Sequence, residues 1–283
     1  MKIFVTGRSG QLGFDVVKEG FFRGHEMHGF GSKELDITDR NQVLKYVTAL
    51  KPEVIIHCAA YTAVDKAEDD QERCSDVNVN GTRYLIEAAK LVRAKFIYIS
   101  TDYVFDGQGI TPYKEEDKVN PVGYYGLTKL QGEQIVQENL EEFFIVRISW
   151  VFGINGNNFV KTMLKLAESR DELNVVSDQV GSPTYTVDLA RLLLDMIRTE
   201  KFGIYHASNE GFCSWADFAT EIFRQANLTV KVKPIPAVQF QTRAKRPNNS
   251  RLSKDKLENN GFKRLPGWEN AVKRFIENLQ EEV

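Results

Sequence analysis

The chain has 283 residues, of which 42% are hydrophobic and 27% are charged, and its formal net charge is −2. This length allows a large buried core and predicts one large domain or two unequal ones. The small net charge gives no sign of a nucleic-acid or membrane-surface partner, and we expect neither a transmembrane segment nor a signal peptide. Three widely spaced cysteines argue against a disulfide framework or a zinc site, so we expect a cytoplasmic protein.

Strand-like and helix-like segments alternate over the first 150 residues. Buried strands are expected at 3–5, 25–30, 54–58, 96–100 and 143–148. Helices are expected at 14–19, 39–50, 73–92 and 122–139, with Gly20 ending the first and Thr38 capping the second. This alternation is typical of an α/β fold with a doubly wound parallel sheet (Rossmann), whose ligands bind at the carboxyl ends of the strands.

The rest of the chain predicts a smaller C-terminal substrate-binding domain that closes a cleft over this edge. We place the NAD(P)-binding Rossmann domain at 1–150, with returning segments near 178–207, and the mainly substrate-binding domain at 151–283. Further helices are expected at 156–168, 187–198, 214–226 and 268–280, and strands at 173–177, 203–207 and 230–235, with 203–207 rejoining the main sheet. Ser214 and Asp217 form a near capping box at the start of one helix.

The turn after the first strand has the pattern G-x-x-G-x-x-G. Gly7 permits the sharp reversal, Gly10 lets the backbone approach a pyrophosphate, and Gly13 lets the next helix lie close to the sheet. The helix start offers free N–H groups and the positive end of its dipole to phosphates. This spacing between a strand and a helix favours dinucleotide binding over an ordinary strand–turn–helix. The predicted cofactor contacts here are Gly7, Arg8, Ser9, Gly10, Gln11, Leu12 and Gly13.

The end of the second expected strand bears on the choice between NADPH and NADH. NAD-selective folds of this type usually carry an acid there, on the ribose hydroxyl, but this strand has none at its tip. Arg8 and Lys33 could meet a 2′-phosphate, or both could be solvated surface cations. We therefore expect NADPH to be somewhat favoured and NADH to be accepted as well, with Asp36 and Ile37 against the adenine.

The third expected strand ends in small side chains. Ala59 and Ala60, followed by Tyr61, leave room for a cofactor to cross the strand end. Tight packing of helix on sheet is the alternative explanation. The position at the carboxyl end of a strand favours the cofactor, so all three residues are predicted contacts.

Two segments carry the chemistry. Tyr125 and Lys129 lie four residues apart, so both face one side of the expected helix. An ammonium beside a phenol lowers its pKa from about 10 and allows proton exchange with a carbonyl oxygen at neutral pH. The Thr101 hydroxyl, at the end of the fourth strand, would hydrogen-bond to the same oxygen. The competing pair, Tyr124 and Thr128, lacks the cation.

These motifs resemble the extended short-chain dehydrogenase/reductase family. Within it the chain is similar to the group of dTDP-4-dehydrorhamnose reductases, and the resemblance covers almost the whole chain. The finer similarity rests on segments 59–68, 147–153, 157–160, 178–184 and 246–252.

The resemblance implies reduction of the C4 ketone of dTDP-4-dehydro-L-rhamnose to dTDP-L-rhamnose by a nicotinamide hydride. Tyr125 would deliver the proton, Lys129 would bind the nicotinamide ribose, and Thr101 would hold the C4 oxygen. The implied substrate contacts are Thr101, Asp102, Tyr103, Trp150, Asn157 and Arg246. Core packing is the alternative for Trp150, and a plain surface charge is the alternative for Arg246.

Other functions stay open at this point. One is a related extended reductase or epimerase acting on another nucleotide sugar, and another is a non-catalytic regulatory subunit of the same fold. Either a monomer or a homodimer is compatible with the sequence. We predict no metal: Asp15 matches an acidic ligand of some relatives but is more often simply exposed, and His57 and His206 are expected in the core or at strand ends.

Overall fold

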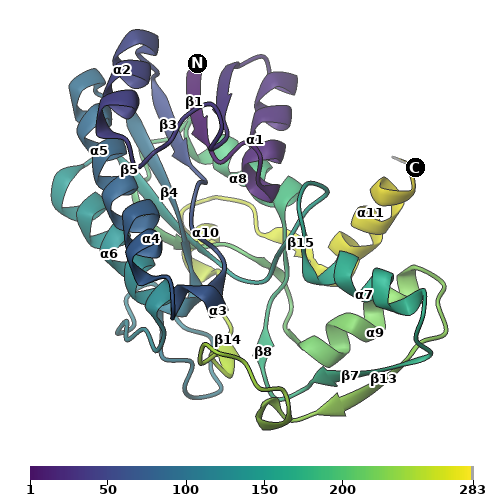
Figure 1. The fold of residues 1–283 in the computed structure, drawn as a ribbon. Helices are drawn as coiled ribbons and strands as arrows, with labels where there is room; N and C mark the ends of the chain where they lie inside the picture. Colours follow the sequence, from purple (N-terminus) through teal and green to yellow (C-terminus); the bar gives the residue numbers. More distant parts are fainter. Residues whose placement is uncertain (282–283) are drawn as a thin grey trace.

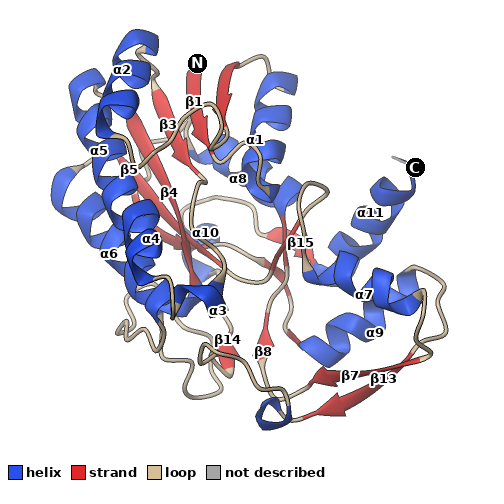
Figure 2. Ribbon diagram, viewed as in Figure 1, coloured by secondary structure: helices blue, strands red, loops and turns tan. Residues whose placement is uncertain are grey.

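A six-stranded, entirely parallel sheet forms the centre of the molecule, in a computed structural model that describes residues 1–281 (Figures 1 and 2). The strand order is β10-β5-β4-β3-β1-β2, which is the doubly wound arrangement. The strands are β1 (Lys2–Thr6), β2 (Glu26–Phe30), β3 (Val54–His57), β4 (Lys95–Thr101), β5 (Phe143–Ile148) and β10 (Gly203–His206). The predicted α/β class is confirmed, and β10 rejoins the sheet beside β5 as expected.

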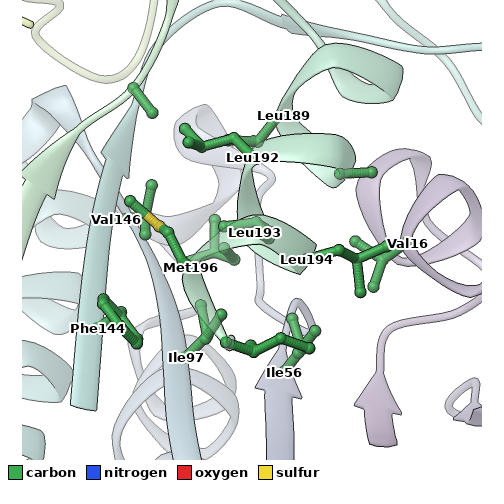
Figure 3. Packing of buried hydrophobic residues seen from close by; sticks show 14 of the residues in the cluster. Val16, Ile56, Ile97, Phe144, Val146, Leu189, Leu192, Leu193, Leu194 and Met196 are labelled. Atoms are coloured by element: carbon green, nitrogen blue, oxygen red, sulfur yellow. The ribbon is translucent and has the colours of Figure 1, made fainter. Parts of the chain in front are cut away.

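Helices cover both faces of this sheet. One face packs against α2 (Arg40–Leu50), α5 (Gly81–Val92) and α6 (Tyr124–Asn139), and the other against α1 (Gln11–Phe22) and α8 (Thr186–Met196). Figure 3 shows the second face, where Leu193 and Met196 of α8 approach Ile97 and Val146 of the sheet and Leu194 meets Val16 of α1. Because both faces are covered, the central strands β1, β3, β4 and β5 are mostly apolar and buried, whereas the edge strand β2 is not.

A third apolar cluster lies outside the sheet, beneath α7 (Phe159–Ala167), α9 (Trp215–Gln225) and α11 (Trp268–Glu281). Strands β7 (Glu172–Val176) and β13 (Lys231–Ile235) pair in parallel at its edge. The shorter elements are α3 (Val64–Ala67), α4 (Gln71–Ser75), a π-helical turn (Asp76–Asn80), β6 (Val151–Phe152), β8 (Val180–Gly181), β9 (Thr184–Tyr185), β11 (Asn209–Glu210), β12 (Cys213–Ser214), β14 (Asn249–Ser250), α10 (Asp255–Asn259) and β15 (Leu265–Gly267). The exact division into domains at residue 150 stays a prediction.

One local prediction was wrong, and two helices differ slightly from their expected form. Asp39, not Thr38, caps α2: its side chain accepts the N–H groups of the first turn, whereas the Thr38 hydroxyl donates to Asp36. Helix α1 extends two residues past Gly20, to Phe22, and Gly20 lies where α1 packs closely on the side chain of Met27. The helix expected over 73–92 is present; it begins at Gln71 and contains the π-helical turn. At α9, by contrast, the capping box of Ser214 and Asp217 is confirmed.

The two histidines expected inside the fold are core residues. His57 lies between the hydroxyls of Thr6 and Thr82, and burial lowers its pKa to about 3, so it is neutral. His206 is fully buried at the end of β10. In residues 1–281, no helix has the length and apolar character needed to cross a bilayer.

Candidate active site

A cavity of about 720 Å³ opens at the carboxyl ends of the strands. It runs from the glycine turn, past the end of β3, to the start of α6. Most of the predicted site residues line it: Gly7, Ser9, Gly10, Gln11, Leu12, Asp36, Ile37, Ala59, Ala60, Tyr61, Thr101, Asp102, Tyr103, Tyr125, Lys129, Trp150 and Asn157. Arg8, Gly13 and Arg246 lie outside the lining. Segments far apart in the sequence therefore form one continuous site.

The glycine turn fits the role of a phosphate cradle. Gly7 has a φ of +74°, and a Cβ there would lie 2.7 Å from the backbone nitrogen of Ala59. A Cβ at Gly13 would lie 2.3 Å from the Gly7 carbonyl oxygen, so this glycine acts in packing α1 onto the turn. Helix α1 begins after Gly10 without a side-chain cap, which leaves its first N–H groups for an anionic group.

Two asparagines outside the predicted site residues hold this turn from the other side; Asn158 lies in the segment 157–160 named above, and Asn155 does not. The side-chain amide of Asn155 donates to the carbonyl oxygens of Ser9 at 2.8 Å and Gly10 at 3.2 Å. Asn158 donates to Gln11 and caps α7. Both come from the loop after β6, about 145 residues away. The only local signal was the asparagine-rich stretch around Gly156.

At the tip of β2, the two basic residues Arg8 and Lys33 are not among the residues that line the cavity. Phe30, Gly31 and Ser32 line it, whereas Arg8 and Lys33 are exposed outside the lining. Glu34 folds back to the tip and accepts the Gly31 N–H at 2.8 Å. Asp36 lines the cavity with its carboxylate held by Thr38, and this hydrogen bonding lowers its pKa. The roles of Arg8 and Lys33 toward a 2′-phosphate stay predictions.

Helix α6, which carries Tyr125 and Lys129, packs closely on the sheet edge at two glycines. A Cβ at Gly126 would lie 2.2 Å from the Tyr103 carbonyl oxygen, and one at Gly132 would lie 2.1 Å from the Tyr98 hydroxyl. The Tyr125 ring meets the Tyr103 ring edge to face, with centroids 5.7 Å apart. Lys129 is buried, and its ammonium lies 4.0 Å from the centre of the Tyr98 ring. Tyr125 and Lys129 thus face the cavity, one turn apart.

The electrostatics correct one prediction. Burial, assisted by the carboxylate of Asp102, raises the pKa of Tyr125 above its ordinary value, although hydrogen bonding with Thr101 opposes the rise. The expected lowering by Lys129 was wrong, because burial also lowers the pKa of Lys129 to about 7 and so weakens its charge. A phenol with a raised pKa stays protonated at neutral pH. It is suited to donating a proton to an oxygen that becomes negative.

Asp102 adds a third perturbed group. It accepts from the Thr101 hydroxyl at 3.0 Å, and its other carboxylate oxygen is buried without a hydrogen-bond partner among the described residues. Burial raises its pKa to about 6. Hydrogen bonding with Ser250 and Thr101 opposes this rise. A carboxyl at the cavity wall can bind a hydroxyl group of a sugar.

Trp150 and Arg246 have structural partners of their own. Trp150 has a φ of +48°, a strained value for a residue with a side chain, and it stacks on Trp215 with centroids 3.7 Å apart. Arg246 pairs with Asp65 at 2.8 Å, and its Nε is buried without a hydrogen-bond partner in the described chain. Protein partners thus hold Trp150 and Arg246 in place, and the contacts of both residues with a substrate stay predictions.

Asp15 is not exposed, contrary to expectation. It is 5% exposed and accepts the Thr186 hydroxyl at 2.5 Å, because α8 covers that side of α1. The carboxylate therefore serves a contact between two helices on one face of the sheet.

A parallel sheet, a glycine cradle and a Tyr–Lys pair at one cavity define an extended short-chain dehydrogenase/reductase, a class of oxidoreductase. The chain belongs to the RmlD substrate binding domain family, whose model matches residues 1–281. It is 40% identical to a dTDP-4-dehydrorhamnose reductase of Aggregatibacter actinomycetemcomitans, over 97% of this chain and 98% of the relative.

Two solved structures are similar over nearly the whole chain, each with a TM-score of 0.96 and 44% identity. One is a dTDP-4-dehydrorhamnose reductase from Clostridium acetobutylicum, with 99% of this chain and 100% of that chain covered. The other is the Bacillus anthracis enzyme of the same name in complex with NADP, with 98% and 100% covered.

Proposed function

We propose that this chain reduces the C4 ketone of dTDP-4-dehydro-L-rhamnose to dTDP-L-rhamnose. The observation that carries the proposal is the single cavity that joins the glycine cradle to Thr101, Tyr125 and Lys129. Several full-length relatives bear the name of this reductase, and one of them is solved with NADP. NADPH is the cofactor, and we expect NADH to be accepted as well. We place the enzyme in the cytoplasm and leave a monomer or homodimer open.

Different residues of the chain bind the cofactor and transfer the proton. The cradle of Gly7 and Gly10 and the start of α1 bind the pyrophosphate. When bound, the reduced nicotinamide supplies the hydride. Thr101 donates a hydrogen bond to the C4 oxygen, and Tyr125 transfers its phenolic proton to the same oxygen as negative charge develops there. Lys129 holds the nicotinamide ribose and stabilises the phenolate that remains.

Residues around Tyr125 bind the parts of the sugar nucleotide other than the C4 oxygen. We assign Asp102, Tyr103 and Trp150 to the sugar, because they line the cavity beside Tyr125. Asn157 and Arg246 are assigned to the nucleotide. A guanidinium matches the oxygens of a diphosphate, and this one already pairs with a carboxylate at 2.8 Å.

Product analysis tests this function directly. The purified protein is incubated with dTDP-4-dehydro-L-rhamnose and either NADPH or NADH, and the product is identified by chromatography and NMR. We expect oxidation of the cofactor in step with formation of dTDP-L-rhamnose. An epimerase would instead retain tightly bound NAD and consume none, and a non-catalytic subunit would consume no cofactor, so either result would contradict the proposal.

A further inference from the structure

A buried ion pair lies directly behind the predicted catalytic residues, outside the cavity lining. Glu133 of α6 and Arg147 of β5 are 0% and 3% exposed. Arg147 donates through Nε to one carboxylate oxygen at 2.9 Å and through Nη2 to the other at 2.7 Å. The Ser100 hydroxyl of β4 donates to the same carboxylate at 2.5 Å. Glu133 therefore joins three elements of the core at one point.

Two of these elements, α6 and β4, carry the predicted catalytic residues. Glu133 follows Lys129 by one helical turn, on the same side of α6. Ser100 directly precedes Thr101 on β4. The carboxylate thus fixes the helix of Tyr125 and Lys129 against the strand of Thr101, where Gly132 allows the helix to touch Tyr98.

The carboxylate is also a charge beside Lys129. Burial lowers the pKa of Lys129, and Glu133 is the largest influence that raises it. On the other packed elements, Arg147 is the cation that faces Glu133. Arg147 also donates to the backbone carbonyl oxygen of Glu115 and lies 3.4 Å from a ring nitrogen of His206. Burial and the charge of Arg147 lower the pKa of His206 well below its ordinary value, so this ring is neutral.

Cys58 and Cys74 also act on Lys129, but burial raises the pKa of both thiols, so they are neutral. The Glu115 carboxylate accepts the backbone N–H of His206 at 2.9 Å. Glu133, one turn from Lys129 on α6, is therefore the carboxylate placed to keep the lysine charged.

Stability gives no sufficient reason for this arrangement. A buried ion pair is often no more stabilising than an apolar pair of similar volume, because both charges lose their hydration. We propose that Glu133, held by Arg147 and Ser100, is a positioning residue that keeps Lys129 charged and in line with Tyr125 and Thr101. This inference rests on the proposed function only in treating Lys129 as the partner of Tyr125.

The variant Glu133→Gln removes the charge but keeps the shape and an acceptor for Ser100. Activity that needs a charged Lys129 is lost as the pH rises through the lysine pKa, and removal of the anion moves that loss to lower pH. We expect the alkaline limb of kcat against pH to move down by about one unit, which is about a tenfold loss of kcat on that limb. An unmoved limb would overturn the proposal.

A double variant separates positioning from structure. Glu133→Leu with Arg147→Met replaces the ion pair by an apolar pair, so that neither member of the pair is left as an unpaired buried charge. We expect its melting temperature to be close to that of the wild type, while the alkaline limb stays displaced as in Glu133→Gln. If the double variant recovered the wild-type limb, the pair would be a packing feature only.

A substrate-free measurement distinguishes this inference from the proposed function. The protein is labelled with ¹³C-lysine, and the Lys129 signal, assigned by its loss in Lys129→Met, is titrated by NMR. We expect it to titrate at lower pH in Glu133→Gln than in the wild type, and equal titration would refute the inference. Failure of the wild type to reduce the sugar nucleotide would overturn the proposed function and leave this titration valid.

Discussion

The single residues of the site owe their chemistry to burial. One end of the cavity holds Tyr125, Lys129 and Asp102, and burial favours the neutral form of each. It raises the pKa of the phenol and of the carboxyl and lowers the pKa of the ammonium. A protonated phenol beside a threonine hydroxyl is ready to donate. The same burial leaves Lys129 poised to change its charge near neutral pH.

Tyr125→Phe removes the proposed proton donor and leaves the ring in place. We expect kcat to fall by about a hundred- to ten-thousand-fold, the usual contribution of a general acid. NADPH affinity, measured by fluorescence titration, stays near the wild-type value, because the glycine cradle is intact. Turnover near the wild-type rate would rule out Tyr125 as the acid.

Asp102→Asn should stabilise the protein at neutral pH. The folded-state pKa of about 6 lies above the unfolded value of about 4, so the folded state binds more protons between them and wild-type stability falls as the pH rises from about 4 to about 6. Above pH 6 the wild type carries the full cost of a buried charge, which asparagine removes. We expect a gain of about 1–3 kcal/mol at pH 7.5 by urea denaturation.

The same comparison at pH 4 serves as the internal control, because both side chains are then neutral. There the two proteins should be equally stable. An equal gain at both pH values would show that charge is not the cause. We also expect a lower kcat/KM for the sugar nucleotide, in keeping with a site residue held at a cost to stability.

At the scale of elements, close approach and end-capping decide where the helices lie. Gly126 and Gly132 set α6 against the sheet edge, and Gly13 sets α1 against the turn. Outside the sheet, α9 is fixed at its start by the reciprocal hydrogen bonds of Ser214 and Asp217. This helix also carries Trp215, on which Trp150 stacks, so its anchorage bears on the substrate end of the site.

Ser214→Ala removes half of that capping box. We expect a loss of about 1 kcal/mol in the free energy of unfolding, with no change in the fold. Thr220→Ala is the matched control, since this exposed hydroxyl of the same helix donates only to the Ala216 carbonyl oxygen. A loss as large in the control as in Ser214→Ala would argue against a special role for the cap.

Across the whole molecule, the segments after residue 150 contact the edge of the sheet through apolar packing, as of Leu252 on Val104 and Phe105, and through several polar side chains. Asn155 reaches the glycine turn, and Arg243 and Arg246 reach the segment after β3 through Asp69 and Asp65. Asp65 also accepts the backbone N–H of Ala244. The segment that bears Arg246 is thus tied to the edge of the cavity by carboxylates, which a diphosphate resembles in charge.

Arg246→Gln tests the assignment to the nucleotide. A lost charge-assisted hydrogen bond costs about 1.5–3 kcal/mol, so KM for the sugar nucleotide should rise at least about tenfold. KM for NADPH should hardly move. Asp65→Asn is the paired variant: it removes the competing carboxylate, and we expect it to lower KM for the sugar nucleotide. An unchanged KM in Arg246→Gln would mean that Arg246 is only a structural partner of Asp65.

The sequence by itself determined the parallel α/β fold, the glycine turn, the capping box and the spacing of Tyr125 and Lys129. These features depend on short-range periodicity and on local hydrogen bonding, which neighbouring residues specify. Local reasoning failed where distant segments decide the environment. Asp15 is buried because α8 covers it, Asn155 reaches a turn about 145 residues earlier, and Glu133 of α6 pairs with a cation on β5. The direction of the Tyr125 pKa belongs to this second group, because desolvation depends on everything that packs around the phenol.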